Sequence, residues 1–218
     1  MATTFQLDAG AVDYLNWLGE SISECEMPGT LRVRVAGSCL AIAQEHHRAI
    51  VALLDHHIYS SSLALLRCQF EAYVRREWLS LCATDLQVEA FASGEEPPPI
   101  KQMILALEET PTFSDKILGK IKTNSWNVMC AFTHTGGLHI QRWGSGNVIE
   151  PDYDDEEIHV ALAMAEIFGA LSVVGVAYLA GADRVAEQVW QKVRERFPKC
   201  ENNAKTMKTM EQWGSDSN

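Results

Sequence analysis

The sequence predicts an all-α protein, folded as a single-domain helical bundle of five to seven helices with at most one small β-hairpin near residues 138–150. Three observations support this class. Apolar residues recur every three to four positions in one segment after another, which places them on one face of a helix. Residues that stop helices, such as Pro28-Gly29, separate these segments. A chain of 218 residues that is 47% hydrophobic can bury one core, and no boundary divides it.

Each helix is predicted from its apolar stripe and from the residues that flank it. Asp8, Thr30 and Ser114 precede three of the stripes, and their side-chain oxygens are of the type that accepts hydrogen bonds from a first helical turn. The Tyr-Ser-Ser segment 59–61 breaks or kinks one long pattern, and the proline-rich residues 94–99 cannot continue another. The expected helices are, in chain order, 11–25, 31–58, 62–82, 86–92, 100–107, 114–134, 156–179 and 183–196.

Two parts of the chain are not expected to be helical. Residues 138–143 and 147–149, joined by the Gly-Ser-Gly segment 144–146, are expected to pair as the small hairpin. The helical domain is expected to cover residues 1–199. Residues 200–218 are polar and poor in apolar side chains, so we expect them to form a disordered tail.

The most apolar stretch of the chain, residues 167–180, is expected to be a core helix. It spans fourteen residues, and roughly 20 are needed to cross a bilayer. We therefore expect no membrane insertion. The helix 158–179 is expected to be central, packed against 62–82 and 114–134.

Composition limits the classes of function. A net charge of −11 disfavours generic attachment to nucleic acid or anionic membranes, because the long-range field repels phosphate, although a local basic pocket can exist within it. The first ten residues lack a basic start followed by an apolar run, and no C-x-x-C pair is present, so we expect a cytoplasmic protein with reduced thiols. The six cysteines are Cys25, Cys39, Cys68, Cys82, Cys130 and Cys200.

The segment 132–143 concentrates polar, titratable residues where a helical pattern stops at paired glycines. Two interpretations of His134 stand. It is either a helix C-cap residue followed by a left-handed Gly136, or a ligand-binding or acid–base group. On the expected strand, His139 and Gln141 share one face and Arg142 lies on the other.

A second polar group repeats along the expected helix 62–82. Arg67, Glu71 and Arg75 are four residues apart and share one helix face. They form either structural ion pairs or a site in which Glu71 orients Arg67 or Arg75 to grip an anion. We expect this stripe to face the end of the helix carrying His134, so that it lines one pocket with the loop 135–142. The candidate ligand-binding residues are Arg67, Glu71, Arg75, His134, His139, Gln141 and Arg142.

The remaining motifs predict neither a metal nor a cofactor. His46, His47, His56 and His57 lie on one expected helix. The eleven residues between His46 and His57 correspond to about 16 Å, too far for one metal ion. The Gly-Ser-Gly segment 144–146 is too short for a phosphate loop or a serine-hydrolase elbow.

Four motifs together resemble an uncharacterised bacterial family of small helical proteins, known as a domain of unknown function. They are EHHRAI at 45–50, ALLRCQFEAYVRREWL at 64–79, FTHTGG at 132–137 and IEPDY at 149–153. The similarity runs from about residue 11 to residue 196. It implies a bacterial, cytoplasmic helical domain and supplies no activity.

A weaker similarity is to HEPN-type helical ribonucleases, which occur in defence and toxin systems. Their signature is an arginine followed four to six residues later by a histidine at a helix end. Here Lys122, Asn124 and Asn127 occupy the turns upstream of His134, which departs from that pattern.

Two functional hypotheses follow. The first is a binding or regulatory module whose polar Arg/Glu/His cleft recognises a small anion, a nucleotide or a protein partner. The alternative is a metal-independent ribonuclease or toxin, with RNA as substrate. There His134 would act as acid–base, Arg67 with Glu71 would complete the catalytic group, and Arg67 or Arg75 would stabilise phosphate. A homodimer is expected under both, because paired long helices commonly expose a second apolar stripe.

Overall fold

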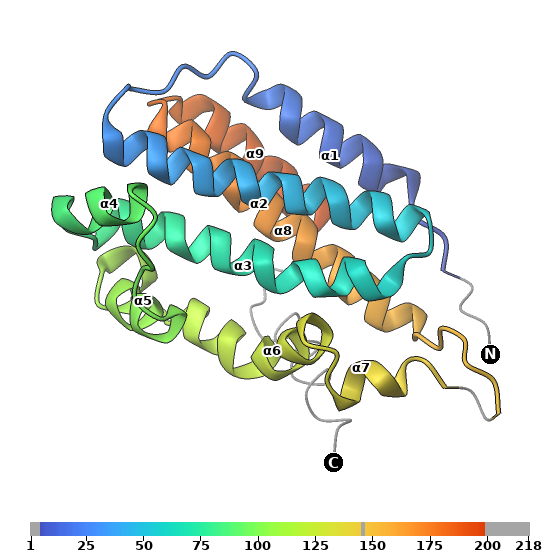
Figure 1. Cartoon of the computed structure of the whole chain (residues 1–218). Coiled ribbons are helices and arrows are strands. Elements are labelled where there is room, and N and C mark those ends of the chain that lie inside the picture. The colour runs from blue at the N-terminus through green and yellow to red at the C-terminus, as the bar shows by residue number, and fades with distance from the viewer. Residues whose placement is uncertain (1–4, 145–146, 199–218) are drawn as a thin grey trace.

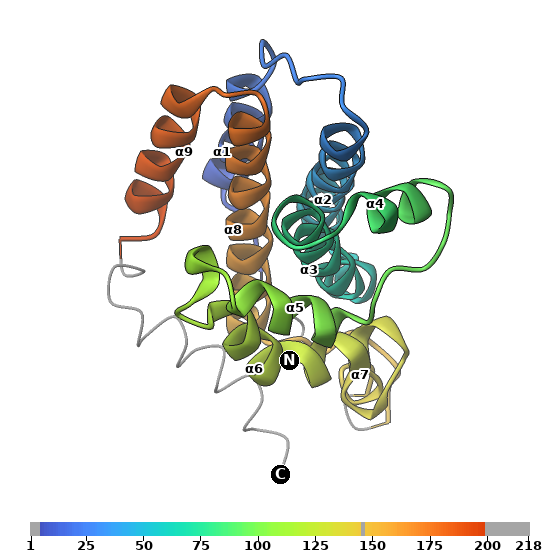
Figure 2. The ribbon, with the colours of Figure 1, turned by 90° about the vertical axis from the view of Figure 1, so that its left-hand side faces the viewer.

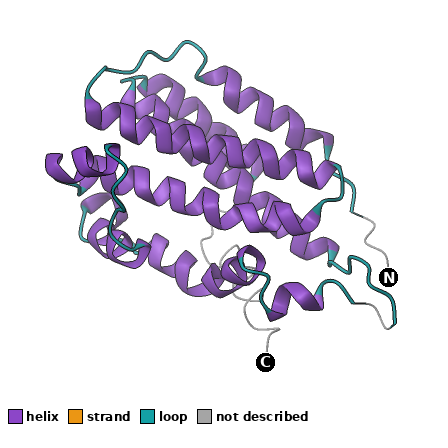
Figure 3. Cartoon of the chain, in the orientation of Figure 1, coloured by secondary structure: helices purple, strands orange, loops and turns teal. Residues whose placement is uncertain are grey.

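Nine α-helices and one short 3₁₀ helix make up the regular structure of residues 5–144 and 147–198, the part of the chain that the computed structural model describes (Figure 1). No strand occurs among them (Figure 3), which confirms the prediction of an all-α, single-domain bundle. The number exceeds the expected five to seven because the short helices α4 and α5, which were among the expected segments, are counted in full, and because the five-residue α7 was not expected as a helix. The elements are α1 (Ala9–Ser21), α2 (Leu31–Asp55), α3 (Tyr59–Leu81), α4 (Asp85–Ala92), α5 (Ile100–Glu108), η1 (Pro111–Phe113), α6 (Ile117–Thr133), α7 (Gly137–Gln141), α8 (Asp155–Leu179) and α9 (Asp183–Arg196). The expected tail, 200–218, lies outside the described residues.

Of the three capping residues predicted from the sequence, two precede the start of a helix. The side chains of Asp8 and Thr30 accept hydrogen bonds from the first turns of α1 and α2, as predicted. The prediction for Ser114 was wrong, because α6 begins three residues later. There the carboxylate of Asp115 accepts a hydrogen bond from the Ile117 N–H at 3.2 Å.

The break between α2 and α3 lies at residues 56–58, just before the predicted position at 59–61. His57 takes a left-handed conformation with φ of 57°. The Ile58 N–H then reaches back to the Leu53 carbonyl at 2.8 Å, which satisfies one of the free carbonyls at the end of α2.

The expected hairpin at 138–149 is replaced by the helix α7. The Gly136 N–H donates to the Ala131 carbonyl at 2.7 Å and closes α6, while the Gly136 carbonyl accepts from the His139 N–H at 2.9 Å and opens the next turn. Thr135 (φ 53°), and not Gly136, is the left-handed residue here. Glycine is still needed at 136, because an added Cβ would lie 3.0 Å from the Ala131 Cα. Residues 145 and 146 lie outside the described part.

The helix α8 is the central element of the bundle. It packs against α2 and α3 on one side and against α1 and α9 on the other, an arrangement visible in Figure 2. Sixteen of its 25 residues are buried. By length and composition it could cross a membrane, but 78% of its most apolar window is buried inside the protein, as expected of a core helix.

Of the two predicted neighbours of α8, the helix 62–82 is confirmed as α3, whereas the helix 114–134 is not a main partner. The main partners of α6 are α3, α5 and α7. At its N-terminal end α6 is separated from α8 by a cavity, which both helices line.

A close crossing of α2 and α8 depends on one glycine. A Cβ added at Gly169 on α8 would lie 2.2 Å from Nδ1 of His47 on α2, so only glycine leaves room for this imidazole. The His47 side chain is 1% exposed, and its Nε2 has no hydrogen-bond partner. Burial lowers the pKa of His47 from 6.5 to about 4, which keeps the ring neutral. This histidine of the predicted cluster is therefore a core residue.

Candidate functional site

The polar stripe of α3 forms a connected ion-pair network. The Arg67 Nε donates to Glu71 Oε1 at 2.8 Å, and the Arg75 Nη2 donates to Glu71 Oε2 at 2.7 Å. Each carboxylate oxygen therefore holds one guanidinium. The three side chains are half-buried to nearly buried, between 14% and 31% exposed. They lie on one helix face, as the spacing predicted.

The histidine at the end of α6 joins this network. His134 Nε2 lies 2.6 Å from Arg67 Nη1. A guanidinium only donates hydrogen bonds, so Nε2 must be the acceptor and the imidazole is neutral with its proton on Nδ1. His134 is also the C-cap residue of α6, where its backbone N–H donates to the Cys130 carbonyl. The interpretation of His134 as a helix C-cap residue is confirmed, whereas its role as a ligand-binding or acid–base group stays a prediction.

Two further side chains belong to the same surface and were missed in the sequence. The Arg67 Cζ lies 4.7 Å from the centroid of the Trp126 ring, and the Lys122 Nζ lies 4.8 Å from it. Both distances allow cation–π attraction. Lys122 and Trp126 are four residues apart on α6, a spacing that indicates a shared helix face, but nothing in the sequence indicates that Arg67 packs there.

We call Arg67, Glu71, Arg75, Lys122 and His134, with the ring of Trp126, the basic cluster. It holds three permanent positive charges and one carboxylate, a surplus of two positive charges. The whole chain carries a net charge of −11. A surplus of this kind on an acidic protein marks a place where an anion is locally favoured.

The three remaining predicted site residues lie outside the basic cluster. Arg142 donates to Glu157 at 2.8 Å, and this carboxylate raises the pKa of the Arg142 guanidinium. His139 is buried, with its ring centroid 5.2 Å from that of Phe132. Gln141 is exposed. The expectation that the loop 135–142 lines one pocket with the α3 stripe is therefore corrected. The turn of α7 directs Arg142 to α8 and His139 to the core, and it leaves Gln141 exposed.

No group of three or more His, Cys, Asp or Glu side chains is placed to hold a metal ion within residues 5–144 and 147–198. The histidines on α2 and just after its C-terminal end lie in different environments. His47 is buried against α8, whereas His57 Nδ1 lies 2.8 Å from the Tyr59 hydroxyl.

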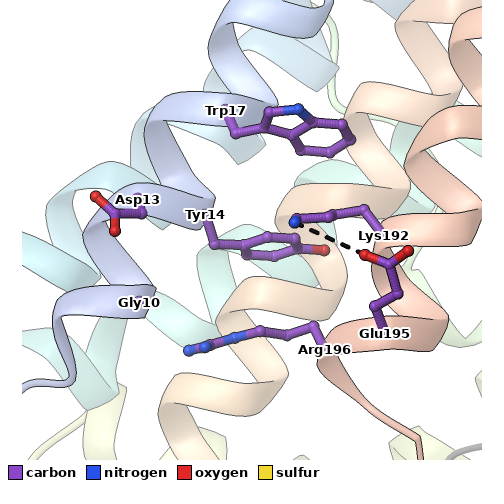
Figure 4. A pocket seen from close by; sticks show the side chains of 7 residues that line it. All are labelled: Gly10, Asp13, Tyr14, Trp17, Lys192, Glu195 and Arg196. Carbon is purple, nitrogen blue, oxygen red and sulfur yellow. Dashed lines mark ion pairs between the residues drawn. The ribbon is translucent and has the colours of Figure 1, made fainter.

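A groove of about 570 Å³ between α1 and α9 was not predicted. Figure 4 shows Tyr14 and Trp17 of α1 facing Lys192 and Arg196 of α9. The Lys192 Nζ lies 5.8 Å from the Trp17 ring centroid and 3.7 Å from the Glu195 carboxylate. Lys192 is thus already paired, and so is Arg196, the other cation of the groove. This pairing favours a packing role of the groove over ligand binding.

The second cation of that groove fastens α9 to the central helix. The Arg196 Nη2 donates to Glu166 Oε1 at 2.9 Å, and the Arg196 Nη1 donates to Asp8 at 3.2 Å. The Glu166 side chain is only 2% exposed, and desolvation raises the pKa of its carboxyl although Arg196 opposes the shift. An ion pair buried to this degree needs both partners.

Comparison with known proteins gives one family. Residues 40–203 match a family of unknown function, DUF6988, and so cover most of the helical bundle. No curated protein and no solved structure matches the chain. The similarity to an uncharacterised family, inferred above from four motifs, is thereby supported over a range that starts later than the expected residue 11. The chain belongs to the family of unknown function DUF6988.

Proposed function

We propose that this protein is a binding module for a small anion, and that the basic cluster is its binding site. The observation that carries the proposal is the sharing of Glu71 by two guanidinium groups, those of Arg67 and Arg75. One carboxylate neutralises one of these charges. The other charge, together with Lys122, is left to attract a ligand.

The side chains of the cluster are already held in place. Arg67 is fixed by three contacts, with Glu71, with His134 and with the Trp126 ring. A guanidinium that is immobilised before binding loses little conformational entropy when a ligand arrives. Among the hydrogen bonds of the described residues, Arg67 Nη2 and Arg75 Nε and Nη1 have no other partner, so these groups can donate to the oxygens of a carboxylate or a phosphate. The ligand class is therefore a small molecule with a phosphate or carboxylate group, such as a nucleotide.

The alternative of a metal-independent ribonuclease draws on the same contact, because Arg67 and His134 lie together. In this arrangement the lone pair of His134 Nε2 is occupied by the arginine proton. That nitrogen is unavailable as a general base until the contact opens. The geometry therefore favours binding over catalysis.

Titration calorimetry with inorganic phosphate and with adenosine monophosphate tests the proposal on the full chain. Arg75→Gln and Lys122→Gln should each weaken binding at least tenfold, because each removes a charge while leaving the Arg67–Glu71 pair intact. The control is Arg194→Gln on α9, which removes an exposed cation paired with Glu187 and should leave the dissociation constant within twofold. Circular dichroism verifies that each variant is folded.

Two results would decide against this function. Binding that is equally strong in Arg75→Gln and in the Arg194→Gln control would show that the anion does not use the cluster. Cleavage of single-stranded RNA that is lost in His134→Ala would favour the ribonuclease instead. Binding through charges predicts in addition that affinity falls as salt is raised.

A further inference from the structure

A second cavity lies on the other side of α3, where the C-terminal halves of α3, α8 and α9 meet the start of α6. Its volume is about 650 Å³, within the range of roughly 300–1,000 Å³ that is usual for small-molecule sites. Its walls are mainly apolar and include Leu118, Ile121, Ile167, Phe168, Leu171 and Val174. None of these residues belongs to the basic cluster.

The polar part of the wall is a buried ion pair. The Arg76 Nη1 donates to Glu77 Oε1 at 2.5 Å, and the Arg76 Nη2 donates to the Gly175 carbonyl at 3.1 Å. Both side chains are 8% exposed. A Cβ at Gly175 would lie 3.0 Å from a Leu40 methyl group and 3.2 Å from the Arg76 Cζ, so the glycine lets both side chains lie close to α8.

Two polar atoms of this wall have no hydrogen-bond partner. They are Arg76 Nε and Ser80 Oγ, both buried. A buried donor without a partner costs about 1–3 kcal/mol, and a bound molecule that brings an acceptor removes that cost. The cavity therefore offers an apolar volume, and the two unsatisfied donors lie just behind its surface, where a ligand oxygen meets them only after the wall side chains shift.

The charges around the cavity select against an anionic ligand. The Arg76 charge is already balanced by Glu77, so no surplus positive charge remains inside. Asp115, an exposed residue that also lines the cavity, adds negative charge near its opening. A carboxylate would have to lose its hydration shell beside these acids, which is costly. A neutral oxygen suits the unpaired donors better.

We propose that this cavity binds a neutral, largely apolar small molecule that carries one hydrogen-bonding oxygen, such as an alcohol or a ketone. A docked helix is disfavoured by size. With a diameter of about 10 Å, a helix filling this volume would be only about 8 Å long, or roughly five residues. The proposal is independent of the anion site, because the residues that carry it are different.

Displacement of a neutral fluorescent probe, N-phenyl-1-naphthylamine, from the full chain tests the proposal. The probe should bind the wild type. Leu171→Trp and Ile121→Trp, which fill the cavity from α8 and from α6, should each weaken binding at least tenfold. The matched control is Leu86→Trp on α4, a residue that is 77% exposed and lies outside the cavity, and it should change binding less than twofold.

The chemistry of the ligand is tested with three competitors of equal chain length. The alcohol 1-octanol should displace the probe at least tenfold better than octanoate. Ser80→Ala should weaken displacement by 1-octanol three- to tenfold and leave displacement by octane unchanged. Failure of the wild type to bind the probe, equal loss in the cavity variants and in Leu86→Trp, or a preference for octanoate would each overturn the proposal.

Discussion

His47 should make the stability of the fold depend on pH between about 4 and 6.5. The unfolded chain releases its imidazolium proton near pH 6.5, whereas burial lowers the folded pKa to about 4. In this window the unfolded state binds more protons, so the free energy of unfolding decreases as the pH falls. A pKa difference of about 2.5, at 1.36 kcal/mol per pH unit, gives a total loss of about 3.4 kcal/mol, of which about 3 kcal/mol occurs between neutral pH and pH 4.

Urea unfolding at a series of pH values measures this loss. The comparison is between the wild type and His47→Leu, which removes the titrating group and also the unpaired Nε2 from the core. Other titrating groups, such as Glu166 and Asp8, contribute equally to both proteins and cancel in the difference. The difference in unfolding free energy should therefore change by about 3 kcal/mol across the window.

A control on the same segment checks that the effect comes from burial. His56, at the end of α2, has a side chain that is 72% exposed, so His56→Leu should leave the pH profile of the wild type unchanged. If His47→Leu shows the same pH profile as the wild type, then His47 is accessible to protons in the folded state, and the packing of α2 on α8 described above is wrong.

Three further predictions concern packing and assembly. Arg196→Met should cost about 3–5 kcal/mol at neutral pH because it strands the buried Glu166 carboxylate, and chemical unfolding should show that cost shrinking as acid protonates Glu166. Gly169→Ala should lower the melting temperature, because its Cβ would meet the His47 ring, and an unchanged melting temperature would contradict this contact. Light scattering should give twice the chain mass of 24.2 kDa if the protein is a homodimer, and the mass of one chain would refute it.

The positions of the helices could be predicted because their causes are local. An apolar stripe and a capping side chain lie within one turn of each other, as at Asp8 and Thr30. The segment 137–141 was wrongly predicted because alternating polar and apolar residues over five positions suit a strand as well as a short helix. The backbone hydrogen bonds at Gly136 select the helix over the strand, and these bonds depend on the left-handed conformation of Thr135.

Only part of the candidate site could be predicted for a related reason. Arg67, Glu71 and Arg75 lie on one helix, so helical geometry alone brings them together. The contact of Arg67 with Trp126 joins residues of two helices, as does that of Arg142 with Glu157. Such contacts depend on how helices pack, and a single sequence does not carry that information directly.

The adjacent arginines of α3 show how far packing decides the role of a residue. Arg75 and Arg76 are neighbours in sequence, and successive residues of a helix point about 100° apart. Arg75 is 31% exposed and shares Glu71 with Arg67, whereas Arg76 is 8% exposed and pairs with Glu77 in the wall of the apolar cavity. One helix thus carries the proposed anion site and the proposed apolar site on different faces. It follows that Arg75→Gln should weaken anion binding and leave the affinity for N-phenyl-1-naphthylamine unchanged.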